Sequence, residues 1–315
     1  MEKNKTQYSV VVPVYNSEGS LPVLHEQLEK VFNKLGSSWE LILVNDCSKD
    51  GSWKIARKLA KKDKRVTAVS LSNNFGQHNA TMCGFSFAKG DYLITMDDDL
   101  QHPPEEIEKL IKKIIESDYW VIYGQFSSER KYGWFRNIAS NAVNSVLSRI
   151  TGSGYKVTQF RILKRAVVEK IAEFTQYNVM IDVLIKDLVS VRDVGHCQVE
   201  HHERTIGKSN YSVKKLFAYA TNMIFSYTLW PLRTATVLGL FFSVVSFLLG
   251  LYFLVDYFIH RVPVQGFTST IVSLAFFSGI ILFVLGIVGE YVGRIFLNIN
   301  RKPQYFVKEV FKQND

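Results

Sequence analysis

Two long stretches without a charged residue constrain this chain more than any other feature. The segments Thr234–Val255 and Val262–Gly289 contain no Asp, Glu, Lys or Arg. They cover about 22 and about 28 residues, and roughly 20 apolar residues in a helix cross the hydrocarbon core of a bilayer. Two membrane-spanning helices are therefore expected. A pair of helices buried in a soluble core is the alternative, although uncharged segments of this length are uncommon there.

The basic residues around these stretches predict their orientation. Lys and Arg accumulate on the cytoplasmic side of spanning helices. The connecting loop offers only Arg261, whereas both outer flanks are basic, with Lys214, Lys215, Arg233, Arg294, Arg301 and Lys302. The larger part of the chain and its tail are therefore expected in the cytoplasm. Residues 212–232 mix basic and aromatic side chains, which is typical of a helix lying in the membrane interface.

Composition bounds the remaining possibilities. The 315 residues are 47% hydrophobic and carry a net charge of +9. This charge suits nucleic acid, an anionic membrane or a phosphorylated substrate, and the apolar stretches favour the membrane over nucleic acid. Cys47, Cys83 and Cys197 have neither the spacing of a metal site nor the even number of a disulfide framework, which favours a reducing compartment. The polar residues 1–7 lead directly into a strand, so no signal peptide is expected.

Strands and helices alternate over the first 120 residues. Expected strands cover 9–15, 40–44, 66–71 and 92–96. Helices are expected over 21–35, from the cap at Ser52 to about Ala60, from the turn at 73–78 to about Ala88, and over 105–116. Pro13 would remove a ladder donor, so the first strand is expected near an edge or to end there. This alternation predicts an α/β fold with a mostly parallel sheet covered on both faces. The apolar stretches add two transmembrane helices to it.

The later part of this domain is less regular. We expect a strand over 119–123, a polar loop over 124–133, a helix over 134–150, a return to the sheet at 158–162 and a final strand over 191–199. The predicted organisation is a cytosolic domain over 1–211, an interfacial region over 212–232, a two-span hairpin over 233–293 and a cytosolic tail over 294–315.

Residues with amide or carboxylate oxygens follow the expected strands. Asn16, Asp46 and the triplet Asp97–Asp99 all lie at carboxyl ends, where the ligands of parallel sheets bind. In an extended segment Asp97, Asp99 and Gln101 share a face and Asp98 points away. Such oxygen ligands suit Mg²⁺ or Mn²⁺ bound to a diphosphate. A solvated acidic loop is the alternative for the triplet, and a simple turn residue is the alternative for Asp46.

Arginines after the acidic site are candidates for binding phosphate. Guanidinium groups hold phosphate oxygens in bidentate fashion. Individually each of these arginines reads as a surface charge, but together they suit phosphate: Arg130, Arg136, Arg161 and Arg204. His201 and His202 have no third ligand at a zinc-like spacing. The chain also has neither GxGxxG nor GxxxxGK[ST], so glycine-rich nucleotide loops are not expected.

The combined motifs resemble glycosyltransferase family 2. They are Val11-Val-Pro-Val-Tyr-Asn16, Val44-Asn-Asp46 with Ser48-Lys-Asp-Gly-Ser52, Asn74-Phe-Gly-Gln-His78, and Gly90-Asp-Tyr through Asp97-Asp-Asp-Leu-Gln-His-Pro-Pro-Glu105. Phe160-Arg161, the loop from His202 to Tyr211 and the ending Gly289-Glu-Tyr-Val-Gly-Arg294 are similar to its polyprenyl-phosphate sugar transferases. That group includes dolichol-phosphate mannose synthase and bacterial undecaprenyl-phosphate glucosyl and aminoarabinose transferases.

The resemblance implies a GT-A fold and assigns residue roles. Asp99 and Gln101 would bind the metal, and the four arginines would contact donor and acceptor phosphates. The nucleotide-sugar would contact Pro13, Tyr15, Asn16, Asp46, Gln77 and Asp97. Two positions depart from the pattern. The family often has alanine in place of Asp98, which could alter metal affinity or merely add an outward-facing charge. Gly124-Gln-Phe126 lacks an arginine that relatives often carry, so one phosphate contact is expected to be missing or displaced to Arg130.

The resemblance also implies a reaction: inverting, metal-dependent transfer of a sugar from a nucleotide-sugar, expected to be UDP-linked, to polyprenyl phosphate at a bacterial cytoplasmic membrane. UDP-glucose and a UDP-N-acetylhexosamine are the first donors expected, and relatives indicate a homo-oligomer, a tetramer. A phosphate monoester has a second pKa near 6, so it attacks as a dianion without a general base. Asp182 is a weak candidate for such a base.

Two rival functions remain open from the sequence. A processive polysaccharide synthase would need a polymer channel and a Gln-x-x-Arg-Trp motif, which is absent. A non-catalytic membrane-anchored binding protein would not need acids at three strand ends.

Overall fold

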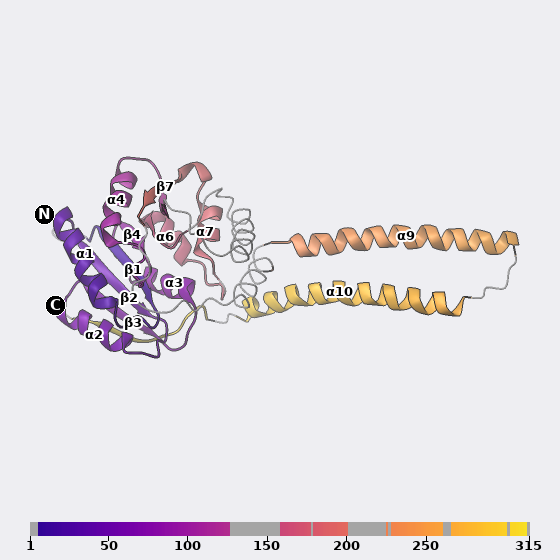
Figure 1. The fold of residues 1–315 in the computed structure, drawn as a ribbon, viewed down its shortest axis with the longest axis horizontal. Coiled ribbons are helices and arrows are strands. Elements are labelled where there is room, and N and C mark those ends of the chain that lie inside the picture. Colours follow the sequence, from indigo (N-terminus) through magenta and orange to yellow (C-terminus); the bar gives the residue numbers. More distant parts are fainter. Residues whose placement is uncertain are drawn as a thin grey trace. The chain divides into compact units, whose positions relative to one another are not determined.

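The computed structural model describes residues 6–126, 158–177, 179–200, 225, 228–260, 266–300 and 303–313. The chain forms two compact units, one comprising Met1–Asn210 with Arg301–Asp315 and the other comprising Tyr211–Asn300. Figure 1 shows a sheet with helices in the first unit and two long helices in the second. The tail that follows the long helices therefore belongs to the first unit.

An eight-stranded sheet forms the centre of the first unit within the described residues, in the order β7-β5-β6-β4-β1-β2-β3-β8. Its strands are β1 Tyr8–Val14, β2 Trp39–Asn45, β3 Val66–Leu71, β4 Tyr92–Thr95, β5 Val121–Phe126, β6 Arg161–Lys164, β7 Val194–Val199 and β8 Val307–Lys312. β1 pairs in parallel with β2 and β4, β2 with β3, and β5 with β7. Only β6 and β8 run antiparallel to their neighbours. The predicted mostly parallel sheet is confirmed.

Helices cover both faces of the sheet because alternate strand residues point to opposite sides. Val10 and Val12 of β1 pack with α1 Leu21–Leu35, α2 Ser52–Lys62 and α4 Ile107–Ile115. Val11, between them, packs on the other face with α3 Gln77–Phe87, α6 Arg165–Ala172 and α7 Ile181–Leu188. Short 3₁₀ helices lie at Pro104–Glu106 and Val191–Asp193. The core strands are thus buried on both sides.

Several boundaries differ from those expected. β1 lies in the middle of the sheet rather than at an edge, and it ends at Val14, directly after Pro13. β4 ends at Thr95, before the acids. β5 continues to Phe126, because the Gly124 N–H donates to the carbonyl of Phe160 at 2.8 Å, so the polar loop expected from residue 124 begins later. The expected helix over 134–150 and most of the interfacial region 212–232 lie outside the described residues.

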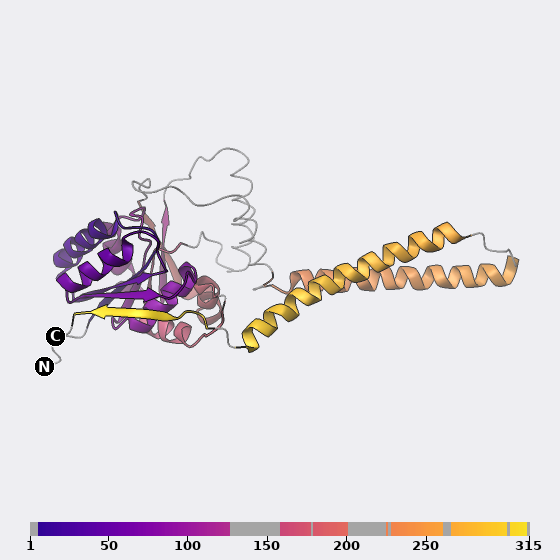
Figure 2. The same ribbon diagram turned by 90° about the horizontal axis from the view of Figure 1, so that it is seen from below.

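The strand β8 was not expected from the sequence. It pairs antiparallel with β3, from Leu71 opposite Val307 to Thr67 opposite Lys312. Just before it, the carbonyl of Phe306 accepts the N–H of Ser72 at 2.9 Å. In Figure 2 this yellow strand lies along the edge of the sheet. The tail residues 303–313 are therefore part of the sheet.

The second unit contains α9 Trp230–His260 and α10 Phe267–Ile299, which lie side by side (Figures 1 and 2). Both are long and apolar enough to cross a membrane, with windows Trp230–Tyr252 and Phe276–Leu297 of mean hydropathy 2.1. These windows are 6% and 0% buried. Exposure of this kind is incompatible with helices of a soluble core. Near the start of α9 and the end of α10, the Tyr291 hydroxyl of α10 donates to the carbonyl of Thr228 at 2.6 Å.

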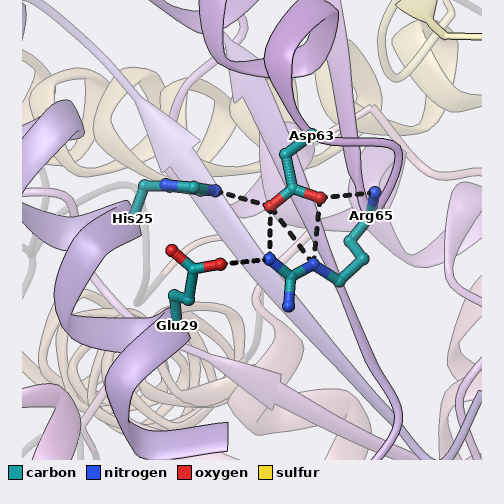
Figure 3. Close-up of polar contacts among 4 residues, drawn as sticks. All are labelled: His25, Glu29, Asp63 and Arg65. Atoms are coloured by element: carbon teal, nitrogen blue, oxygen red, sulfur yellow. Dashed lines mark hydrogen bonds and ion pairs between the residues drawn. The ribbon is translucent and has the colours of Figure 1, made fainter. Parts of the chain in front are cut away.

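A polar cluster joins α1 to the start of β3 (Figure 3). Arg65 donates through Nε to Oδ1 of Asp63 at 2.9 Å and through Nη2 to Oδ2 of Asp63 at 2.8 Å. The same Nη2 reaches Glu29 at 2.5 Å, and His25 Nε2 lies 2.9 Å from Asp63. Arg65 also stacks over the Trp39 ring at 4.9 Å. Burial raises the pKa of Asp63, but the hydrogen bonds from Arg65 and His25 outweigh it and lower that pKa to about 2.

We expect Asp63→Asn to reduce the free energy of unfolding by about 1–2 kcal/mol at neutral pH. The folded protein holds the carboxylate ionised more strongly than the unfolded chain, where the pKa is about 3.9. Its contribution is therefore complete above about pH 4 and is lost as the pH falls toward about 2. Thermal unfolding of the full chain in detergent micelles should show a difference from the wild type that shrinks over this range.

The matched control is Glu26→Gln. It removes the exposed Glu26–Lys30 pair on α1, the helix that also carries His25 and Glu29 of the cluster. Such a pair contributes little to stability. An Asp63→Asn difference that persists unchanged down to pH 2.5 would show that the lost stability does not come from the ionised carboxylate.

Candidate active site

Polar residues gather at the carboxyl ends of β1, β2, β3 and β4. These four strands are parallel neighbours, so the segments that follow them, 15–20, 46–51, 72–76 and 96–103, leave the same edge of the sheet. The predicted convergence of Asn16, Asp46 and the acidic triplet follows from this arrangement. The hydrogen bonds below show which side chain faces which segment.

Asp97 faces the start of α3, where Gln77 Nε2 donates to its Oδ1. Burial, and after it the charges of Asp99 and Asp98, raise the pKa of Asp97 to about 7. The hydrogen bond from Gln77 and the positive charge of Arg161 oppose this rise but do not cancel it. The turn therefore concentrates more negative charge than its own donors compensate, which is the situation that a bound cation relieves.

Asp98 faces a different segment from Asp97 and does not point outward into solvent. Its Oδ2 accepts the backbone N–H of Tyr15 at 2.9 Å. Burial raises the pKa of Asp98, whereas hydrogen bonds from the Ser17 side chain and the Tyr15 N–H lower it. The expectation of an outward-facing charge was wrong, because the segment after β1 packs over this carboxylate.

Asp99 and Gln101 are brought together by a turn and not by strand alternation. β4 ends at Thr95, and Leu100 has a φ of 59°, so the extended geometry behind the predicted phase does not reach these residues. Asp99 Oδ1 instead accepts the backbone N–H of Gln101 at 3.1 Å. The strand alternation predicted for Asp99 and Gln101 is therefore wrong, and their shared role at a metal stays a prediction.

The oxygen donors at this turn fit a hard divalent cation. Among the described residues no three His, Cys, Asp or Glu side chains converge as a complete metal site. Mg²⁺ commonly binds through one or two carboxylates and completes its shell with water and substrate phosphate. Asp99 is suited to such a role, since it adjoins two further carboxylates, and its charge is one of the causes, after burial, that raise the pKa of Asp97.

Asp46 does more than form a turn. It is 4% exposed, and its carboxylate accepts the backbone N–H of Phe75 at 2.7 Å and of Gly76 at 2.9 Å. Gly76 has a φ of 87°, which a residue with a side chain rarely adopts. Asp46 therefore fixes the segment that leads into α3 and Gln77, and only its remaining lone pairs are left for a ligand.

The segment after β1 carries the other predicted donor contacts. Pro13 is the penultimate residue of β1, and Tyr15 is 40% exposed. Asn16 has a φ of 55°, its N–H donates to Ser48 Oγ at 3.1 Å, and its Oδ1 accepts the N–H of Lys49 at 2.8 Å. The segments after β1 and β2 are thus joined, with Tyr15 available at the surface.

Arg161 lies in β6 and is 0% exposed, so the expectation of a surface arginine in a loop was wrong. It forms an ion pair with Asp182, which also accepts the Tyr123 hydroxyl at 3.0 Å. Arg161 Nη2 donates to Gln159 at 3.2 Å. A buried guanidinium needs a buried carboxylate, and α7 supplies it from its first turn.

This pairing also bears on Asp182 as a general base. Its carboxylate is occupied by Arg161 and Tyr123, so it is not poised to accept a proton. Sequence reasoning missed Tyr123, and it missed His78, whose pKa is lowered by burial. In the sequence, the signal for this buried polar cluster was Asp182, an acid next to the apolar residues at the start of the segment Ile181–Leu188.

Arg130, Arg136 and Arg204 lie outside the described residues. The segments that contain them begin after Phe126 of β5 and Val199 of β7, which are paired in parallel register. β5 runs in the direction of β4, because both are antiparallel to β6. Both segments therefore start from the sheet edge that carries the acids.

Comparisons with known proteins agree with this architecture. The family model for glycosyl transferase family 2 matches residues 9–182. Undecaprenyl-phosphate 4-deoxy-4-formamido-L-arabinose transferase of Proteus mirabilis is 36% identical over 307 residues, covering 96% of this chain and 93% of the relative. The relative of the same name from Photorhabdus laumondii is 34% identical, covering 97% of this chain and 94% of its own.

Solved structures show a similar fold at low sequence identity. Glucosyl-3-phosphoglycerate synthase of Mycobacterium tuberculosis, in complex with Mn²⁺, UDP-glucose and phosphoglyceric acid, superposes with a TM-score of 0.55 at 14% identity. The match covers 70% of this chain and 78% of that chain. At this identity the likeness speaks for the fold alone.

Proposed function

Because the chain belongs to glycosyltransferase family 2, we propose that it moves a sugar from a nucleotide-sugar to the phosphate of a polyprenyl lipid. Its GT-A fold is the fold of a nucleotide-sugar transferase. The observation that carries the proposal is near full-length similarity to transferases whose name specifies undecaprenyl phosphate as the acceptor. Asn16, Asp46 and the triplet Asp97–Asp99 at the carboxyl ends of β1, β2 and β4 support it independently.

The donor is proposed to lie across the ends of β1 to β4, with a UDP moiety as the resemblance implies. Tyr15 and Asn16 would contact the nucleoside from one side, and Gln77 and Asp97 from the other. Asp46 would act chiefly by holding the segment before α3 in place. The relatives' name makes 4-deoxy-4-formamido-L-arabinose the first sugar to test, ahead of glucose and N-acetylhexosamines.

The departing diphosphate is the group whose charge grows most during transfer. Asp99 and Gln101 would hold Mg²⁺ or Mn²⁺ there, and such an ion supplies positive charge to the leaving group. Gln77 keeps the Asp97 carboxylate directed toward α3. Arg130, Arg136 and Arg204 are proposed to bind phosphate oxygens, whereas Arg161 acts from within the core, since it is fully buried.

The acceptor phosphate needs no general base from this chain. A phosphate monoester is largely a dianion at neutral pH and is therefore already nucleophilic. This agrees with Asp182 being held by Arg161 and Tyr123. Attack at the anomeric carbon from the face opposite the leaving diphosphate inverts the configuration.

We propose that α9 and α10 cross the cytoplasmic membrane as a hairpin. Their apolar windows are exposed and long enough for a bilayer. Basic residues at both outer flanks favour placing the sheet domain in the cytoplasm. The polyprenyl phosphate would then be presented at the surface of the bilayer that holds the enzyme.

The test is a transfer assay with the purified full chain in detergent. We expect undecaprenyl phosphate, a divalent cation and the correct UDP-sugar to give a lipid whose mass has increased by one sugar residue, with one UDP released per product. Chelating the cation or omitting the lipid should remove the product. If a full panel of nucleotide-sugars yields no lipid-linked sugar and calorimetry detects no nucleotide binding, a non-catalytic membrane protein becomes the better description.

A further inference from the structure

The segment after β1 is held by a residue that the reaction as described does not require. Asp98 Oδ2 accepts the N–H of Tyr15 at 2.9 Å, and the Ser17 side chain hydrogen-bonds the same carboxylate. The hydroxyl of Ser17 lies 3.2 Å from the Tyr15 carbonyl, so its one proton is shared between that carbonyl and the Asp98 carboxylate. The turn after β4 and the segment after β1 are therefore tied together through one side chain.

From there the hydrogen bonds continue to the segment after β2. Asn16 contacts Ser48 and Lys49, as described above, and the Ser17 N–H donates to Ser52 Oγ at 2.8 Å. Ser48 in turn donates its N–H to Asn45 Oδ1 at 3.2 Å. The two segments thus form one layer, which carries Tyr15 and Asn16 and adjoins Asp46.

The three acids consequently face three different partners. Asp97 is directed to Gln77 of α3, Asp98 to Tyr15, and Asp99 to the turn at Gln101. Charge-assisted hydrogen bonds from a carboxylate to backbone N–H groups are strong and directional. The Asp98 carboxylate accepts the Tyr15 N–H, so it can hold the layer formed by the segments after β1 and β2. It is directed away from the turn at Asp99.

We propose that Asp98 is a positioning residue that sets the affinity for the nucleotide half of the donor through the Tyr15–Ser17 segment, without binding the metal. The inference rests on the proposed function, because it requires a nucleotide donor over this layer. It separates the roles within the triplet: Asp99 serves the diphosphate and Asp98 the nucleoside.

Two substitutions distinguish this role from metal binding. Asp98→Asn keeps an oxygen that can accept the Tyr15 N–H, whereas Asp98→Ala removes the acceptor. For a positioning residue, Asn should therefore preserve most of the function and Ala should not. For a metal ligand, both substitutions remove the charge and should be similarly damaging.

The experiment measures UDP binding by calorimetry in saturating Mn²⁺, and transfer kinetics with the full chain in detergent. We expect Asp98→Ala to raise the Kd for UDP and the KM for the donor by about tenfold, with kcat within about twofold of the wild type. Asp98→Asn should stay within about threefold in both. The Mn²⁺ concentration that gives half-maximal activity should not change in either variant. Ser17→Ala should weaken UDP binding in the same direction by a smaller factor.

Two results would overturn the inference. Equal increases in the Mn²⁺ requirement for Asp98→Ala and Asp98→Asn would identify Asp98 as a metal ligand. UDP affinity unchanged in Asp98→Ala would show that its contact with Tyr15 does not govern the donor site. Failure of the wild-type protein to bind any nucleoside diphosphate would contradict the proposed function instead, and would remove the ground for this inference with it.

Discussion

Replacing Asp99 with Asn is expected to reduce sugar transfer by a factor of at least about 10², while the protein remains folded. Asn has nearly the same shape, and its side-chain oxygen can still accept the Gln101 N–H that Asp99 accepts at 3.1 Å. The local turn is therefore preserved and only the negative charge is lost. The loss should appear in the initial rate of lipid-linked sugar formation, with an unchanged thermal midpoint.

Adding Mn²⁺ tests whether the lost negative charge of Asp99 is the cause of the lower rate. Excess Mn²⁺ should recover part of the activity of Asp99→Asn, because a weakened site fills at higher concentration. The matched control is Glu105→Gln, which neutralises an exposed acid six residues further along and should leave the rate nearly unchanged. Asp99→Asn activity within about threefold of the wild type would remove Asp99 from the proposed metal site.

Arg161→Met is expected to lower the free energy of unfolding by about 3–5 kcal/mol. The substitution leaves the Asp182 carboxyl group in the core without its ion-pair partner, while its hydrogen bond from the Tyr123 hydroxyl remains. Arg161 is 0% exposed and Asp182 is 6% exposed, so water cannot replace the lost partner without local opening. Thermal unfolding in detergent should show a midpoint lower by roughly 10 °C.

A double substitution tests whether unpaired charge is the cause. Arg161→Met with Asp182→Asn removes both charges and keeps an acceptor for Tyr123, so it should be more stable than Arg161→Met alone. Arg57→Met is the matched control, because Arg57 is 48% exposed and lies 3.7 Å from Glu309. It should change stability by no more than about 0.5 kcal/mol. A double variant no more stable than the single one would point to lost packing instead.

Local patterns in the sequence predicted the sheet and the convergence of the acids well. The β-strands around Val10 and Leu41 are apolar at consecutive positions, as strands covered on both faces must be. Strands that alternate with helices run parallel, so Asn16, Asp46 and Asp97 had to meet at one edge. These inferences needed no information on distant contacts.

The errors arose where distant contacts or backbone geometry decide. Leu100 adopts a positive φ, which its residue type does not reveal, and this turn invalidated the alternation assumed for Asp99 and Gln101. Arg161 is buried because Asp182, on a helix that follows later in the chain, neutralises it. Neither the positive φ of Leu100 nor the pairing of Arg161 with Asp182 produces a periodic pattern in the sequence. The roles of Arg130, Arg136 and Arg204 remain predictions.

The pairing of β8 with β3 has a consequence for how the protein is made. A ribosome releases β3 early, and it releases β8 only after both apolar helices have been synthesised. Until then the edge of β3 has no partner, and unpaired strand edges are sites of aggregation. The sheet can therefore close only after both apolar helices have been synthesised, and a nascent chain that stalls after α10 would carry an open edge at β3.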